Sequence, residues 1–231
     1  MTPDFSKFEE IAGVIFVNKQ LLRQAFTHRS FLNENKATEL VHNERLEFLG
    51  DAVLELAVTD FLYRTYPDAT EGDLTAYRSA LVNADTLSEV AQMLHMNDYL
   101  LLSRGEKKDT GRARQYILAN TAEAVIGAMY VDQGYEPAKY FISRHILPLV
   151  DKIIREKTWI DAKSLFQEKA QEAVGSTPVY KTLKEEGPDH SKKFTVGVYL
   201  KDILIGEGTG DSKQDAEQKA ARAGLEKKKW L

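Results

Sequence analysis

Acidic side chains in the first quarter of the chain are the residues best suited to chemistry. In a helix predicted over residues 44–65, Glu47 and Asp51 stand four residues apart and share one face, with Glu44 one turn earlier. Like charges at this spacing repel, and the apolar residues between them keep part of the face away from water. A hard cation such as Mg²⁺, which prefers oxygen ligands, would relieve the repulsion. A solvated polar face without a ligand is the alternative for these three residues, and we assign Glu55 to such a face.

A second predicted helix, Ile117–Tyr130, offers a matching pair of oxygen-bearing side chains. Asn120 and Glu123 stand three residues apart in this otherwise apolar segment. A lone glutamate in apolar surroundings is costly unless it has a partner. The partner is either a cation such as Arg78 or, if the two helices face each other, a metal ion shared with the first acidic group.

Two kinds of hydrophobic pattern divide the chain near residue 156. Before it, helical periodicity recurs without a convincing strand; the predicted helices are Gln20–Thr27, Glu44–Thr65, Glu71–Val82, Ala84–Leu94, Ile117–Tyr130 and Pro137–Glu156. After it, alternation typical of strands appears between two helices; these elements are a helix over 162–174, strands over 178–186, 193–200 and 203–208, and a helix ending near 226. We therefore expect an all-α domain over 1–156 and a small α+β domain of α-β-β-β-α order over 157–231.

Composition narrows the functional classes. The chain has no cysteine, which excludes disulfides, thiol catalysis and thiolate metal sites and agrees with a cytoplasmic location. Neither a signal peptide nor an apolar run of about 20 residues is evident, so we expect no membrane partner. The net charge of −4 hides an asymmetry: residues 161–231 carry 13 Lys and Arg against 12 Asp and Glu, whereas residues 1–160 carry 18 against 23. The histidines lack zinc-ligand spacing, no Ser/His/Asp pattern suggests acyl chemistry, and we expect no organic cofactor.

The segment Asn43–Asp51, NERLEFLGD, resembles the signature of the ribonuclease III family. Thr27–Ser30, Glu71–Val82 and Ile117–Tyr130 resemble the flanking motifs of that family, in the same order. The resemblance extends over essentially the whole chain, because the C-terminal pattern is similar to a double-stranded RNA-binding domain. It implies a helical nuclease domain followed by an RNA-binding domain.

The resemblance also implies roles for individual residues. Metal-ligand and catalytic positions fall on Glu47, Asp51 and Glu123, with Asn120 at a fourth ligand position. The implied ion is Mg²⁺, with Mn²⁺ as a substitute. Positions near the cleavage site that hold RNA or the site's architecture fall on Glu44 and Glu71, and Phe48 falls on a residue that inserts into a second subunit. The implied enzyme is a homodimer that cuts each strand of double-stranded RNA, leaves 5′-phosphates and short 3′ overhangs, and processes ribosomal and messenger RNA.

In the second domain, the resemblance assigns RNA contacts to two helices and a loop. The residues concerned are Gln167, Glu168, His190, Ser212 and Lys213. Such domains read the A-form shape of RNA rather than its sequence. Where basic residues often follow Lys213, this chain has Gln214 and Asp215, so the charge must come from other lysines; the candidates are Lys192, Lys193 and Lys219. We therefore expect modest affinity with a shallow dependence on salt.

Asn120 departs from the family pattern, which has an aspartate at this position. An amide still offers a carbonyl oxygen to Mg²⁺ but removes one negative charge. We favour an active nuclease, and we keep as the alternative a catalytically weakened protein that binds double-stranded RNA on the same fold. A phosphohydrolase acting on small molecules would not explain the attached RNA-binding domain.

Overall fold

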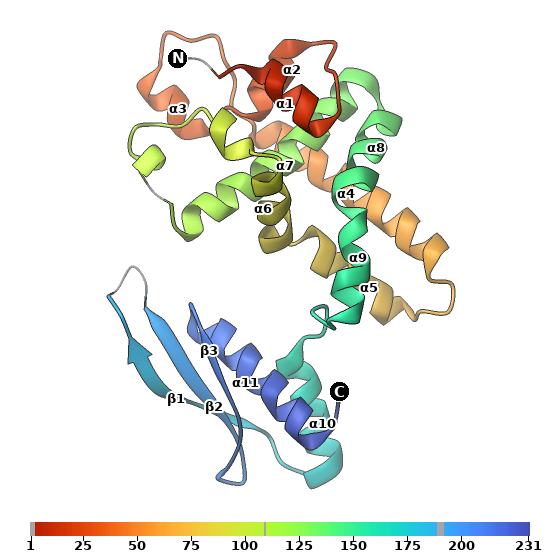
Figure 1. Ribbon diagram of the computed structural model, residues 1–231, viewed down its shortest axis with the longest axis vertical. Helices are drawn as coiled ribbons and strands as arrows, with labels where there is room; N and C mark the ends of the chain where they lie inside the picture. The colour runs from red at the N-terminus through yellow and green to blue at the C-terminus, as the bar shows by residue number, and fades with distance from the viewer. Residues whose placement is uncertain (1–2, 109, 189–191) are drawn as a thin grey trace. The chain divides into compact units, whose positions relative to one another are not determined.

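The computed structural model describes residues 3–108, 110–188 and 192–231, and the chain divides into two compact units (Figure 1). The first unit comprises residues 1–159 and the second residues 160–231. The hydrophobic pattern of the sequence predicts a division after residue 156. The structure keeps Trp159 with the first unit, because its ring packs edge-on against Tyr77 at a centroid distance of 4.9 Å.

The described residues of the first unit form helices, with a single isolated bridge between Thr27 and Leu101 instead of a sheet. The α-helices are α1 (Phe5–Ala12), α2 (Lys19–Ala25), α3 (Arg29–Glu34), α4 (Glu44–Thr65), α5 (Glu71–Val82), α6 (Ala84–Met93), α7 (Arg112–Gln133), α8 (Tyr135–His145) and α9 (Val150–Arg155). Three short 3₁₀ helices are η1 (Met96–Tyr99), η2 (Glu106–Lys108) and η3 (Leu147–Leu149). Among the described residues, no helix is both long and apolar enough to cross a membrane.

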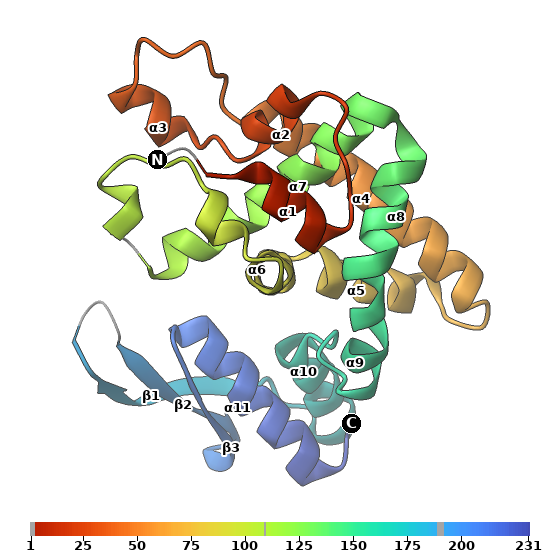
Figure 2. The ribbon, with the colours of Figure 1, turned by 45° about the horizontal axis from the view of Figure 1, so that its top comes forward.

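Helices α4 and α7 form the centre of this unit and lie against each other, as both ribbon views show (Figures 1 and 2). Each has 22 residues, and α2, α6 and α8 also pack on α7. Both helices carry fully buried apolar residues, among them Leu54, Val58, Val125 and Ile126. Burial of these side chains is the main stabilising contribution to the pair, because helices gain most of their stability from packing of an apolar face.

Most of the predicted helices are confirmed, and the differences have local causes. Helix α4 has the predicted bounds, whereas the helix predicted over 137–156 is divided by η3. Pro148, within η3, lacks the N–H needed to continue α8 and enforces the break. Helices α1 and α3 were not predicted; both are shorter than three turns, and α3 buries none of its residues.

The second unit contains α10 (Ala162–Val174), β1 (Val179–Glu186), β2 (Lys193–Leu200), β3 (Ile203–Gly210) and α11 (Lys213–Lys228). The three strands form an antiparallel sheet in the order β1-β2-β3, which confirms the predicted α-β-β-β-α order. Helix α11 lies close to the sheet because small residues face it. A Cβ atom on Gly208 would lie 2.2 Å from the backbone nitrogen of Ala220, so only glycine allows this approach.

Candidate active site

Two glycines bring the acidic helices together. A Cβ atom on Gly50 of α4 would lie 1.8 Å from the carbonyl oxygen of Glu123, and one on Gly127 of α7 would lie 2.1 Å from the carbonyl oxygen of Leu46. The two backbones are therefore in direct contact at this crossing. Glu47 and Asp51 flank Gly50 in the sequence, and Glu123 stands one turn before Gly127, so the crossing places carboxylates of both helices beside each other.

Glu123 has the most perturbed environment of this group. Burial, together with the negative charges of Asp51 and Glu47, raises the pKa of its carboxyl from 4.5 to about 8. The carboxyl groups of the two helices therefore repel one another in a partly water-excluded space. Residues with strongly perturbed pKa values are characteristic of functional sites.

The carboxyl group of Glu47 lies in the same partly buried and negatively charged surroundings. Burial is the main reason that its pKa is raised, followed by the charge of Glu44, and Asp51 acts in the same direction. The amide of Asn120 opposes this shift by favouring the ionised carboxylate, which places Asn120 beside Glu47. The structure thus brings together Glu47, Asp51, Asn120 and Glu123, with Asp51 exposed and the other three half-buried.

The alternative partner for Glu123 is not supported. Arg78 donates instead to the hydroxyl of Thr59 at 3.2 Å, and Glu123 makes no ion pair among the residues that the structure describes. As the side chains stand, however, no three Asp, Glu or His side chains within the described ranges are arranged to hold one metal ion. The donor set of three carboxylates and one amide suits a hard cation, and carboxylate rotation would be needed for them to share it.

Glu44 begins α4, where its charge acts on Glu47, and it lies beside a guanidinium and an imidazole ring. Its carboxylate is 3.8 Å from the guanidinium of Arg29 and 3.7 Å from Nδ1 of His42. His28 is half-buried nearby, and burial lowers the pKa of its ring while the charges of Glu106 and Glu44 oppose that shift. The sequence excludes these histidines only as zinc ligands; the signal that could have placed His28 here is the Thr27–Ser30 motif, in which His28 caps the start of α3.

Glu71 and Phe48 occupy separate places. Glu71 is the first residue of α5, is exposed, and accepts a hydrogen bond from the hydroxyl of Thr75 at 3.2 Å. Among the described residues, Glu71 makes no hydrogen bond or ion pair with the four-residue cluster. Phe48 leaves the outer face of α4 with 81% of its surface exposed, although it is a large apolar residue. Such exposure is expected of a side chain that a partner covers.

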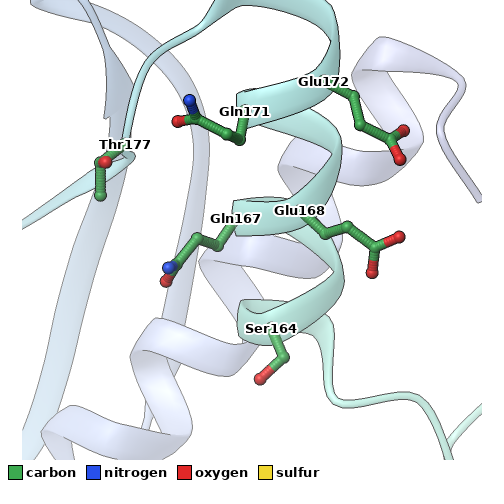
Figure 3. Close-up of a pocket in the computed structure, with 6 residues that line it drawn as sticks. All are labelled: Ser164, Gln167, Glu168, Gln171, Glu172 and Thr177. Atoms are coloured by element: carbon green, nitrogen blue, oxygen red, sulfur yellow. The ribbon is translucent and has the colours of Figure 1, made fainter.

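The predicted RNA-contacting residues of α10 line one pocket of the second unit (Figure 3). Gln167 and Gln171 point toward the side of Thr177, whereas Glu168 and Glu172 point to the other side of the helix (Figure 3). The pocket is lined by neutral and acidic residues, without a lysine or arginine. It therefore suits hydrogen bonding to ribose hydroxyls and base edges better than phosphate binding.

The four lysines that are candidates for RNA contact are paired with acidic neighbours. Lys213 lies 3.0 Å from Glu185 and over the ring of Phe194. The other three candidates are also paired; the pairs are Lys192 with Glu185, Lys193 with Asp211, and Lys219 with Asp215. The hydroxyl of Ser212 already caps α11 by accepting from the backbone N–H of Asp215 at 3.1 Å. His190 lies outside the described residues.

Comparison with known proteins agrees with these two units. The family described as Ribonuclease-III-like matches residues 18–150, and the family described as double-stranded RNA binding motif matches residues 162–228. Ribonuclease 3 of Carboxydothermus hydrogenoformans is 46% identical over 218 residues, which cover 94% of this chain and 93% of that protein. Ribonuclease 3 of Pelotomaculum thermopropionicum is 45% identical over 215 residues, covering 93% and 89%.

The nuclease domain of ribonuclease III from Campylobacter jejuni has a similar structure. It superimposes with a TM-score of 0.57 at 38% identity, covering 64% of this chain and 97% of that one. The sequence similarity to these relatives spans both units. The structural similarity covers a length close to that of the first unit. The chain belongs to the ribonuclease III family.

Proposed function

We propose that this protein is an endoribonuclease that hydrolyses phosphodiester bonds in double-stranded RNA with the help of Mg²⁺. The single observation that carries the proposal is the crossing of α4 and α7 at Gly50 and Gly127, which holds Glu47, Asp51 and Glu123 side by side. The charges of Asp51 and Glu47 help to raise the pKa of Glu123, so this acidic group lacks a countercharge, and a divalent ion would provide one. The double-stranded RNA binding motif on the same chain indicates the substrate.

Glu47, Asp51 and Glu123 would hold the ion, with the carbonyl oxygen of Asn120 as the fourth donor and Mn²⁺ as a substitute for Mg²⁺. The chemistry that Mg²⁺ would supply there is activation of water and stabilisation of the leaving 3′ oxygen, with a 5′-phosphate in the product. Glu123 has to lose its proton before it can bind, because burial keeps the carboxyl neutral to higher pH than usual. Glu44 lies beside Arg29, whose guanidinium offsets part of its charge.

The active form in this proposal is a homodimer. Phe48, 81% exposed on α4, is the residue proposed to enter the partner subunit. The Campylobacter jejuni relative is described as having a region involved in dimer formation of its nuclease domain. Two subunits would supply two acidic clusters, one for each RNA strand, and short 3′ overhangs follow if the two cuts are offset. We place this activity in the cytoplasm, in processing of ribosomal and messenger RNA.

Incubation with a perfect RNA duplex and with single-stranded RNA of the same sequence tests the proposal. Each RNA is mixed with the unmodified protein in Mg²⁺ and in EDTA, beside a Glu123→Ala variant. Cleavage of the duplex alone, lost in EDTA and in the variant, is the expected result. Duplex binding without cleavage under every condition would instead support the weakened, RNA-binding alternative, for which Asn120 is the argument.

A further inference from the structure

The connection between the two units is short and largely fixed at its first end. Helix α9 ends at Arg155, and the chain then reverses because Lys157 adopts a left-handed conformation with φ 52°. The backbone N–H of Lys157 donates to Ile154 at 3.2 Å, and that of Thr158 donates to Ile153 at 3.1 Å. These bonds close the end of the helix and direct the following residue back over the first unit.

That following residue is Trp159, which is anchored on α5. Its ring meets the ring of Tyr77 edge-on, at 4.9 Å and an interplanar angle of 87°. Tyr77 in turn contacts Tyr66 edge-on at 5.8 Å. The indole N–H of Trp159 is buried without a hydrogen-bond partner among the described residues, so ring packing alone holds the side chain. Edge-to-face aromatic pairs are stabilising beyond the area that they bury.

The connection is equally fixed at its second end. Asp161 caps α10 by accepting from the backbone N–H of Lys163 at 3.1 Å and of Ser164 at 3.2 Å. The same carboxylate accepts from the amide of Gln218, on α11, at 2.8 Å. Asp161 therefore belongs to the second unit as firmly as Trp159 belongs to the first. Ile160 is the single residue between the two anchors.

The composition of the connection agrees with this geometry. The residues from Glu156 to Asp161 include no glycine, serine or proline. Flexible spacers are usually rich in glycine and serine, and extended stiff ones in proline. The composition of this segment is typical of neither kind of spacer, in agreement with a connection that is held by contacts with neighbouring residues.

We propose that Trp159 is a positioning residue for RNA binding: by docking on Tyr77 it confines the pivot between the two units to Ile160. The inference rests on the proposed function, since a confined pivot matters only if the chain binds duplex RNA. A one-residue pivot sets the point from which the RNA-binding unit leaves the nuclease unit. That point lies on α5, whose first residue is Glu71. A short tether also keeps the effective concentration of the second unit high, and that concentration falls steeply as a tether lengthens.

Fluorescence tests whether the anchor holds when RNA binds. The chain has two tryptophans, and Trp230→Phe leaves Trp159 as the single reporter while keeping a ring beside Phe166. The emission maximum and acrylamide quenching of Trp159 are recorded with and without duplex RNA in EDTA, and Tyr77→Ala provides the signal of a released indole. Unchanged emission and quenching are expected on RNA binding. A shift toward the Tyr77→Ala signal would overturn the inference, because the pivot would then include Trp159.

Kinetics test whether the short pivot matters. Insertion of Gly-Ser-Gly-Ser-Gly after Ile160 lengthens the free segment while leaving Trp159 docked. Because effective concentration falls roughly as the −3/2 power of tether length, KM for duplex cleavage should rise about tenfold with kcat unchanged. Trp159→Ala lengthens the free segment from one residue to two and should raise KM about threefold with kcat unchanged, whereas Trp159→Phe keeps a packing ring and should stay within about twofold of the unmodified chain.

Thermal unfolding separates positioning from folding, because the insertion should leave Tm unchanged while KM rises. A KM within about twofold of the unmodified value for the insertion would overturn the inference. If the unmodified protein does not cleave duplex RNA, the proposed function fails, and the fluorescence of Trp159 still decides where the pivot lies.

Discussion

Replacement of Glu123 by glutamine should stabilise the metal-free protein at alkaline pH while abolishing cleavage. The pKa of this carboxyl rises from 4.5 to about 8 on folding, mainly through burial. The folded chain therefore holds one proton more than the unfolded chain between these values, and its stability falls as the pH rises through this interval. Above pH 8 the buried carboxylate is ionised beside Asp51 and Glu47, and the uncharged glutamine avoids that cost.

The expected size of the effect follows from the pKa. A rise from 4.5 to about 8 corresponds at most to about 5 kcal/mol, at about 1.4 kcal/mol per pH unit. Glu123 is only half-buried, and screening by solvent reduces this figure to about 2 kcal/mol. For a unit of 159 residues, that corresponds to a Tm about 4–8 °C higher for the variant at pH 9, and to little difference at pH 5.

Differential scanning calorimetry in EDTA between pH 5 and 9 provides the measurement. Glu55→Gln, the same chemical change one turn beyond the cluster on α4, serves as the matched control and should follow the pH dependence of the unmodified chain. Addition of Mg²⁺ should raise the Tm of the unmodified chain more than that of Glu123→Gln. A Tm difference that does not change with pH would refute the reasoning, because it would mean that Glu123 is not held among other carboxylates.

Three further predictions concern the helix crossing, the metal and the dimer. Gly127→Ala places a methyl group 2.1 Å from the backbone oxygen of Leu46 and should lower the free energy of unfolding in urea by about 3 kcal/mol. A loss below about 1 kcal/mol would show that α4 and α7 can move apart at little cost in stability. Asn120→Asp adds one negative charge, worth about 1 kcal/mol toward a nearby cation, and should lower the Mg²⁺ concentration for half-maximal cleavage about fivefold; an unchanged requirement would place Asn120 outside the ion's reach. Phe48→Ala should convert dimers to monomers at micromolar concentration in analytical ultracentrifugation, since buried aromatic residues at interfaces contribute about 2–4 kcal/mol. A dimer that persists unaltered in this variant would show that Phe48 does not contribute to the interface.

Much of the fold could be predicted because the periodicity of the long elements is strong. Helix α4 was predicted with its observed bounds, and β2 with both of its ends, since alternation over eight residues is unambiguous. The division of the helix predicted over 137–156 was missed even though Pro148 signals it, because the apolar spacing continues on both sides. The end of the first unit was placed too early because a tryptophan that folds back onto a distant helix leaves no local pattern.

The composition of the acidic cluster was predictable from spacing, whereas its electrostatics were not. The i, i+4 and i, i+3 relations put Glu47 with Asp51 and Asn120 with Glu123, but only the backbone contact at Gly50 brings the two pairs together. The pairing of Lys213 and its neighbouring lysines with acidic residues also required the structure, because Glu185 comes from a strand distant in sequence.

A crystal of the protein soaked with Mn²⁺ and measured for anomalous scattering tests the central claim most directly. The account predicts an anomalous peak between α4 and α7, with carboxylate oxygens of Glu47, Asp51 and Glu123 about 2.1–2.3 Å away, as expected for a small hard cation. Absence of any peak there at a Mn²⁺ concentration that supports duplex cleavage, or a peak bound by other residues, would contradict it.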